Sequence, residues 1–292
     1  MQGTVDGFGY GFVTPVVAFL LAWLGAALGL RCTTRSLHAR RSRRAGWLAL
    51  AATSIGSGIW TMHFVAMLGF TVEEAAVTYD RPLTFASLAV AVVMVGVGIF
   101  LVGYRGATPM ALVTGGTITG LGVASMHYLG MAGMQFDGQF AYDTLTVSLS
   151  VVIAVVASTA SLWAAVSIRG LLPSLGAGVV MGVAVSGMHY TGMAALQVHL
   201  HPGAATGTTG DTPTSLLLPM MIGPGCFLLL AGVVLVFDPL VVTDGPDGPE
   251  GRARPSGRGL PAGGQVTAIP VQRRHTSSAG TARREVRQPR DR

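Results

Sequence analysis

Seven long apolar runs, separated by short polar stretches, make up most of the first 237 residues. The runs cover about residues 11–30, 46–68, 83–103, 110–134, 145–168, 175–198 and 215–237. Each run is close to the roughly 20 residues that an α-helix needs to cross the hydrocarbon core of a bilayer. Inside a bilayer the backbone must satisfy its own hydrogen bonds, and a helix does so within one segment. The pattern therefore predicts an all-α integral membrane protein with seven transmembrane helices.

The composition changes abruptly after the seventh run. Residues 238–292 are rich in Gly, Pro, Ser and Arg and contain no Phe, Tyr or Trp. Such a segment buries too little apolar surface to fold. We therefore expect a membrane domain over residues 1–237 and a disordered, basic cytoplasmic tail over residues 238–292. The tail is too short for a cyclase, phosphodiesterase or kinase domain.

The distribution of charge predicts the orientation in the membrane. Charged residues make up only 11% of the chain, against about 25% in soluble domains. The short stretch between the first two runs, residues 31–44, carries six arginines. Loops of this kind stay in the cytoplasm, which places the N-terminus outside and the C-terminus in the cytoplasm. Because the arginines flank membrane runs or lie in the tail, the net charge of +6 does not indicate a nucleic-acid partner.

A six-residue phrase occurs three times, each time near the C-terminal end of an apolar run. The copies are Met-His-Phe-Val-Ala-Met at 62–67, Met-His-Tyr-Leu-Gly-Met at 126–131 and Met-His-Tyr-Thr-Gly-Met at 188–193. Their runs all point outward, so runs 2–3, 4–5 and 6–7 are expected to form three parallel two-helix repeats around an axis along the membrane normal. The three histidines should then lie at one depth, near the outer surface.

Each copy predicts a stripe of residues on one face of its helix. A glycine stands seven positions before each histidine, and a methionine stands four positions after it. These positions share a helix face. The glycines, Gly56, Gly120 and Gly182, belong to small-xxx-small pairs that allow helix backbones to approach closely. We therefore expect the histidines to point into the bundle.

The three stripes together indicate a metal site, because histidines inside membrane spans are rare and usually functional. The predicted ligands are His63, His127, His189, Met67, Met131 and Met193. A secondary shell would consist of Met62, Met126 and Met188, and Tyr128 and Tyr190 are candidates for contact with a bound ligand. Imidazole suits copper, zinc and iron, whereas thioether sulfur selects copper, above all Cu(I). Copper is therefore the predicted cofactor.

The repeated phrase resembles the MHYT domain, a bacterial integral-membrane sensor family, and the resemblance covers roughly residues 10–237. The third copy matches all four letters, whereas the first has Phe64 and Val65 and the second has Leu129. The resemblance implies a protein of the bacterial cytoplasmic (inner) membrane that binds copper through Met and His. It also implies sensing of a diatomic gas such as O2, CO or NO. Many relatives are fused to cyclic-di-GMP enzymes, but the short tail predicts a stand-alone form without that output.

Three functions remain open on this basis. The first is a metal-binding sensor for a gas or for copper, which signals through its helices or through a separate signalling protein. The second is a copper-handling protein for transport, or for delivery to an oxidase with an assembly partner. The third is a haem- or quinone-linked electron carrier. Catalysis is not expected, because the sequence has no nucleophile motif, no phosphate-binding loop and no paired carboxylates in its apolar runs. The oligomeric state is left open.

Overall fold

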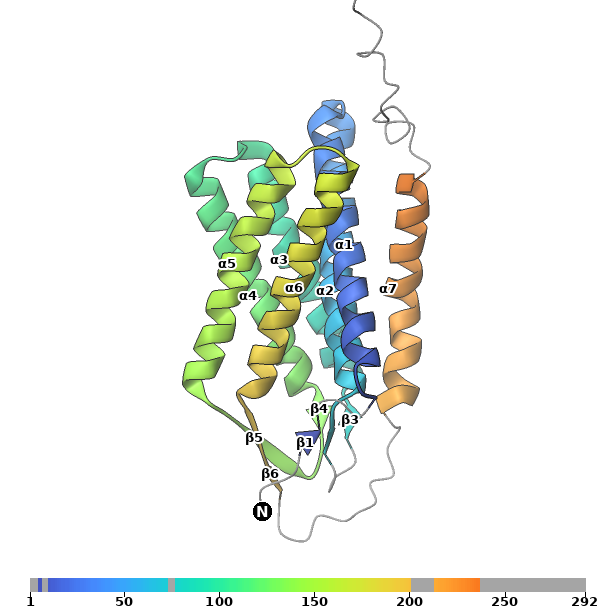
Figure 1. The fold of residues 1–292 in the computed structure, drawn as a ribbon, viewed down its shortest axis with the longest axis vertical. Helices are drawn as coiled ribbons and strands as arrows, with labels where there is room; N and C mark the ends of the chain where they lie inside the picture. The colour runs from blue at the N-terminus through green and yellow to red at the C-terminus, as the bar shows by residue number, and fades with distance from the viewer. Residues whose placement is uncertain (1–4, 7–9, 73–76, 201–212, 237–292) are drawn as a thin grey trace, which may run out of the picture. The chain divides into compact units, whose positions relative to one another are not determined.

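The computed structural model describes residues 5–6, 10–72, 77–200 and 213–236 (Figure 1). The chain divides into two units, residues 1–248 and 249–292. The second unit lies outside the described residues, and so does the expected cytoplasmic tail at 238–292.

Seven α-helices make up most of the described part of the first unit. They are α1 (Val13–His38), α2 (Arg41–Leu68), α3 (Arg81–Arg105), α4 (Pro109–Ala132), α5 (Thr144–Ser167), α6 (Leu171–Ala194) and α7 (Pro213–Val236). Six of them, α1 to α6, are long and apolar enough to cross a membrane, and α7 contains the shorter apolar stretch Leu217–Val233. The prediction of an all-helical protein with membrane-length apolar helices is confirmed at this level.

The first six helices form a closed ring. Each helix packs against the next one along the chain, and α6 closes the ring by packing against α1 (Figure 1). The seventh helix, α7, packs against α2 and α1. The motif helices α2, α4 and α6 therefore alternate around the ring with α1, α3 and α5.

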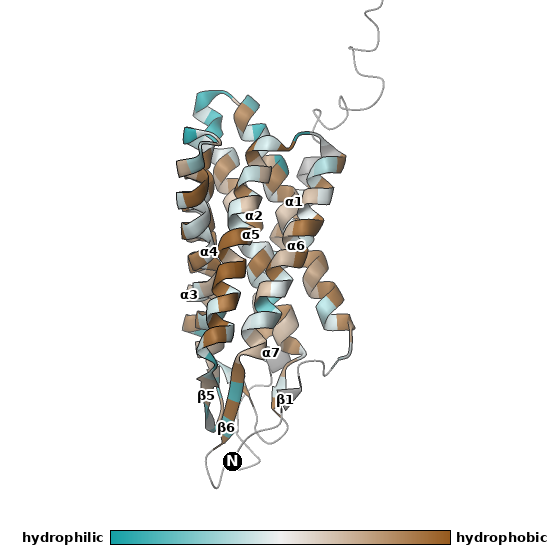
Figure 2. Ribbon diagram, turned by 60° about the vertical axis from the view of Figure 1, so that its left-hand side comes forward, coloured by the Kyte–Doolittle hydropathy of each residue, from teal (hydrophilic) through white to brown (hydrophobic). Residues whose placement is uncertain are grey.

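The ring is apolar outside and contains polar side chains inside. Large apolar residues are exposed on the outer helix faces, for example Val97, Val156 and Val180. Figure 2 shows hydrophobic residues along the length of the helices. Small polar side chains such as Ser54 and Ser150 are fully buried. This arrangement suits a bundle whose outer face contacts lipid, where polar groups must find partners within the protein.

Short strands close the end of the ring at which the motif helices finish. They are β1 (Val5–Asp6), β2 (Thr71–Val72), β3 (Thr78–Tyr79), β4 (Met134–Gln135), β5 (Gly138–Tyr142) and β6 (Leu196–Leu200). The strand after each motif helix pairs antiparallel with the strand before the preceding helix: β2 with β1, β4 with β3, and β6 with β5. The pairs thus close three strand–helix–helix–strand units, α1–α2, α3–α4 and α5–α6 (Figure 1).

The grouping expected from the sequence, with runs 2–3, 4–5 and 6–7 as hairpins, differs from these units. In the closed ring α2 also packs against α3, and α4 against α5, so the expected pairs 2–3 and 4–5 are in contact, although each joins two different units. Run 6 was expected to pair with run 7. Instead α6 packs against α1, while α7 contacts α2 and α1. The glycines repeat this pattern. A Cβ at Gly56 would lie 2.8 Å from the Cα of Val92 in α3, and one at Gly182 would lie 3.0 Å from the ring of Phe19 in α1.

The glycines of the motif stripes therefore hold each motif helix against α3, α5 or α1, not against another motif helix. Gly120 has the tightest of these contacts, since an added Cβ would lie 2.5 Å from the Cα of Val155. We expect Gly120→Ala to lower the free energy of unfolding by about 1–3 kcal/mol, because backbone atoms cannot move aside as a side chain can.

The control for this prediction is Gly187→Ala on α6, where an added Cβ has no neighbour within 4 Å. It should be neutral or stabilising, because alanine favours a helix by about 1 kcal/mol over glycine. Unfolding of both variants is followed by circular dichroism in mixed micelles. Equal stability of the two proteins would show that α4 and α5 do not touch at this point.

Aspartates fix the start of two corresponding helices. Asp80 accepts a hydrogen bond from the backbone N–H of Leu83 at 2.7 Å, and Asp143 accepts one from that of Thr146 at 2.8 Å. The hydroxyl of Thr146 also donates to Asp143, and these hydrogen bonds hold the pKa of this carboxyl below its usual range. Such caps satisfy the free N–H groups of a first helical turn. They show that α3 and α5 are in register with an offset of 63 residues, the difference between positions 80 and 143.

The apolar runs located the helices but not all of their ends. Most of the stretch 31–44, expected to be a loop, is helical, because α1 continues to His38 and α2 begins at Arg41. A helix satisfies its own hydrogen bonds and need not stop where the apolar run does. Conversely, the runs expected to reach residues 134 and 198 end as helices at Ala132 and Ala194 and continue as β4 and β6.

Candidate metal centre

Three histidines from three different helices meet inside the ring. His63 lies on α2, His127 on α4 and His189 on α6, each five residues before the last residue of its helix. Because the spacing to the helix end is the same, the three side chains reach one level. Their exposed fractions are 1%, 1% and 2%. The histidines thus face one another inside the bundle, as the stripes predict.

The Nδ1 atoms of the three rings form a nearly equilateral triangle. The distances are 3.1 Å between His63 and His189, 3.2 Å between His63 and His127, and 3.3 Å between His127 and His189. The rings stand nearly perpendicular to one another, with interplanar angles of 78°, 81° and 89°. In the described part of the chain, this is the only group of three His, Cys, Asp or Glu side chains placed to hold one metal ion.

Hydrogen bonds among the three rings cannot satisfy this triangle. A neutral imidazole has one nitrogen that donates and one that accepts. A single Nδ1–H can point to two acceptor nitrogens, but those two acceptors then face each other without a proton between them. Two N–H groups in the triangle would direct hydrogens at each other. A positive centre that three lone pairs share would satisfy all three nitrogens.

A metal ion fits the spacing of the triangle. Three nitrogens bound at about 2.0 Å to one ion, with tetrahedral angles between the bonds, lie about 3.3 Å apart. The observed separations of 3.1–3.3 Å match this value. Three protein ligands also leave one position of a tetrahedral ion free for a further ligand. The three histidines could therefore bind a metal ion.

The aromatic residue that follows each histidine packs against it. The ring of Phe64 lies 4.6 Å from that of His63, Tyr128 lies 4.8 Å from His127, and Tyr190 lies 5.0 Å from His189, all at steep interplanar angles. Edge-to-face contacts of this kind are favourable and fix ring orientation. They explain why Phe64 can stand where the other copies have tyrosine.

The tyrosine hydroxyls were expected to contact a bound ligand. That of Tyr128 forms a 2.7 Å hydrogen bond with the Ser150 hydroxyl of α5, and Ser150 itself donates to the Val147 carbonyl. This hydrogen bond links the α4 motif to α5. In the structure, Tyr128 therefore positions α4 against α5. Tyr190 is half-buried. Ligand contact by either tyrosine stays a prediction.

The motif methionines are buried to different extents. Five of the six are at most 1% exposed: Met62, Met67, Met126, Met131 and Met188. The sixth, Met193, is only partly buried. In the first two copies, the predicted ligands Met67 and Met131 are therefore as deeply buried as Met62 and Met126 of the predicted secondary shell. Thioether groups in such a dry environment would favour a soft metal ion.

Two glycines of the motif have a role that the sequence did not show. A Cβ at Gly130 would lie 2.6 Å from Nε2 of His63, and a Cβ at Gly192 would lie 2.6 Å from Nε2 of His127. Each imidazole thus rests on the backbone of the next motif helix. These two Nε2 atoms are buried and have no hydrogen-bond partner among the described residues. The sequence showed only that this motif position is small; Ala66 occupies it in the first copy.

Comparison with known proteins identifies the repeated units. A profile of the MHYT family, described as "bacterial signalling protein N terminal repeat", matches residues 56–115, 120–178 and 182–236. Each matched segment begins at a motif glycine: Gly56, Gly120 or Gly182. The three segments together cover more than half of the chain. No solved structure is significantly similar to the chain.

Several signalling proteins share this region. The bifunctional diguanylate cyclase/cyclic di-GMP phosphodiesterase MucR of Pseudomonas aeruginosa is 38% identical over 69% of this chain and 30% of its own length. The cyclic di-GMP phosphodiesterase NbdA of the same species is 35% identical over 64% and 24%, and the signaling protein YkoW of Bacillus subtilis is 33% identical over 52% and 20%. The chain thus spans less than a third of the length of these relatives.

The matched segments contain the three histidines, and the described part of the chain has six helices of membrane length. The chain therefore belongs to the MHYT family of bacterial signalling proteins and is a multi-pass protein of the inner membrane.

Proposed function

We propose that residues 1–237 are a copper-binding membrane sensor domain in which His63, His127 and His189 hold one copper ion. The observation that carries this proposal is the buried triangle of Nδ1 atoms at 3.1–3.3 Å. The ion would supply a binding position for one further small ligand. The protein supplies the rest: the helix ends set the level of the imidazoles, the aromatic rings orient them, and burial excludes water.

Copper is favoured by the chemistry of the donors. The triangle offers three neutral nitrogens and no carboxylate or thiolate. Five buried methionines place polarisable sulfur in the same region, which suits Cu(I) better than zinc or iron. A haem between two axial histidines would need the rings on opposite faces of a macrocycle. The contact distances between the three imidazoles favour a single ion instead.

The test of this proposal is the metal content of protein purified without a histidine tag and reconstituted in nanodiscs. We expect one copper per chain, with nitrogen hyperfine coupling in the electron paramagnetic resonance spectrum of the oxidised form. Zinc in place of copper after exposure to both ions, or no bound metal at all, would contradict the proposal.

We propose that the sensed signal is a diatomic gas or copper itself. Support for a gas comes from the family resemblance and from the free ligand position of a three-histidine site. A bound ligand shifts a conformational equilibrium only if it binds the two states with different affinity. A site shared by three helices meets this condition, since movement of one helix changes the triangle. Two relatives are named as cyclic-di-GMP enzymes, and we propose an output enzyme of that kind as the partner.

The proposed membrane arrangement has seven spans, including α7, with the N-terminus outside and the site near the outer surface. A reporter that is active only in the cytoplasm should work when it is fused after Arg44, Arg105 or Arg169, because the arginine-rich ends stay inside. It should be inactive when fused after Glu74, Asp143 or Gly210. Activity in the fusion at Glu74 would invert the arrangement and place the triangle near the cytoplasm.

A further inference from the structure

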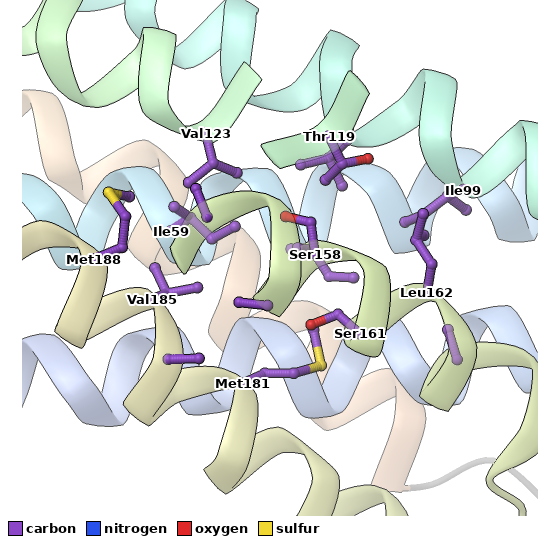
Figure 3. Close-up of a pocket in the computed structure, with 16 residues that line it drawn as sticks. Ile59, Ile99, Thr119, Val123, Ser158, Ser161, Leu162, Met181, Val185 and Met188 are labelled. Atoms are coloured by element: carbon purple, nitrogen blue, oxygen red, sulfur yellow. The ribbon is translucent and has the colours of Figure 1, made fainter. Parts of the chain in front are cut away.

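The ring encloses a cavity beside the metal centre, on the side away from the strands. The centre of a water-sized sphere can move through about 30 Å3 of it, and α2, α3, α4, α5 and α6 all contribute to its wall. Figure 3 shows Ile59, Val123, Val185 and Met188 at one end and Ser158, Ser161 and Met181 towards the other. We call this cavity the chamber. No charged residue lines it.

The chamber is in register with the histidines. Ile59, Val123 and Val185 line it, and each stands four positions before the histidine of its helix. The next lining position, eight before the histidine, is Ile55, Thr119 or Met181. Four and eight residues correspond to about 6 and 12 Å along a helix, on nearly the same face. The chamber therefore begins one helical turn from the imidazoles and continues along the same axis.

The reason for the chamber lies in the α5–α6 pair. In the other two pairs a glycine brings the helices into contact: a Cβ at Gly25 of α1 would lie 2.6 Å from the Ser54 carbonyl, and one at Gly98 of α3 would collide with the Thr119 hydroxyl. The aspartate caps place Ser161 of α5 at the position of Gly98. Ser161 and Met181 of α6 both line the chamber (Figure 3). At this level the α5–α6 pair therefore has side chains where the other two pairs have a glycine contact.

Small residues line the chamber along α5. They are Ala154, Ala157, Ser158, Ser161 and Ala165, with spacings of three and four that put them on one face. The wall is aliphatic apart from three hydroxyl groups and two thioether sulfurs. Enclosed cavities of this character stay dry and bind apolar molecules or xenon. The surrounding bilayer dissolves the same molecules.

We propose that the chamber is a binding site for small uncharged apolar molecules of a few atoms, which reach the metal centre through it from the membrane interior. The binding itself depends on the cavity alone. The role as a route rests on the proposed copper site. Ile59, Val123, Val185 and Met188 form the wall at one end of the chamber, and each lies within four positions of a histidine. Water and ions would gain little there, since the wall offers them few polar partners.

Xenon is the direct probe of the chamber. Crystals or nanodiscs of the full chain are pressurised with xenon, and its position is determined by anomalous scattering or by 129Xe magnetic resonance. We expect a xenon site between α4, α5 and α6 in wild type. Ala157→Leu and Ala184→Leu should each abolish it, because the added side chain fills the space. Ala160→Leu is the control on α5, since Ala160 is exposed on the outer face and is not part of the chamber wall.

A variant that enlarges the chamber keeps the test valid if the filled variants do not fold. Val123→Ala removes two methyl groups from the wall and should raise xenon occupancy. No xenon in wild type, or equal occupancy in wild type, Ala157→Leu and Val123→Ala, would overturn the proposal.

The second measurement separates the chamber from the metal site. In protein loaded with Cu(I), the rate of carbon monoxide binding is followed by its infrared band. Ala157→Leu should lower this rate at least tenfold and leave the copper content unchanged. Xenon binding without copper binding would support the chamber and refute the copper site. Unchanged carbon monoxide kinetics in a variant that has lost xenon would refute the route.

Discussion

We expect that replacing any one of His63, His127 and His189 by alanine removes most of the copper bound by the wild-type protein. Without the third nitrogen ligand, the two remaining imidazoles should bind copper too weakly to retain it against competing chelators. The metal content of the purified variants measures the effect directly. In addition, copper should raise the melting temperature of wild type but not of the variants, because only a protein that binds the ion is stabilised by it.

The control is His199→Ala, at an exposed position of β6 near the same end of the ring. It should retain full copper content. Loss of one buried histidine also removes packing, so melting temperatures of the metal-free proteins are compared first. If the protein with all three histidines replaced retains its copper, the triangle is not the site.

Substitution of Gly192 or Gly130 by alanine should weaken copper binding without removing any ligand. The added methyl group would lie 2.6 Å from Nε2 of His127 or His63 and must push the imidazole towards the centre of the triangle. Metal–nitrogen distances tolerate changes of only about 0.2 Å. Residues that orient ligands typically alter metal affinity by about 10–100-fold, and we expect a loss in this range.

Gly187→Ala is again the matched control, because it lies on the same helix as Gly192 and has free space around it. Affinity is measured by competition with a chelator of known copper affinity. The expected signature is reduced affinity with a changed spectrum of the bound copper and an unchanged fold. Wild-type affinity in both Gly192→Ala and Gly130→Ala would show that the imidazoles do not rest on these backbones.

The candidate site was largely predictable because its residues repeat with one spacing. Each histidine stands five residues from its helix end, so three copies of one motif place three rings at one level. The spacing also predicted that the rings point inward. It could not predict which ring nitrogen points to the centre or which residue supports each ring, because both depend on the distance between helices. Gly130 and Gly192 were therefore missed.

The membrane helices were predictable for a different reason. A bilayer requires about 20 apolar residues per helix, and this requirement appears directly in the sequence. The basic stretch at 31–44 shows that an apolar run does not predict where a helix ends. The run marks where the membrane ends, whereas α1 and α2 continue beyond that point as helices. The short strands were not predicted, since pairs of only two to five residues form when the helix ends bring the strands together.

The sequence by itself determined the helical membrane fold, the inward face of each motif helix and the common level of the three histidines, because each follows from local spacing. Only the tertiary structure decided that α1 lies beside α6. Both α1 and α7 are apolar, so composition does not distinguish them. The choice depends on fit: the Trp23 indole of α1 donates to the Leu175 carbonyl of α6 at 3.0 Å, and Gly178 and Gly182 leave room for Trp23 and Phe19. The chamber beside the metal centre depends on fit in the same way. Ser161 of α5 stands where α3 has Gly98, so the α5–α6 pair lacks the close glycine contact of the other two pairs.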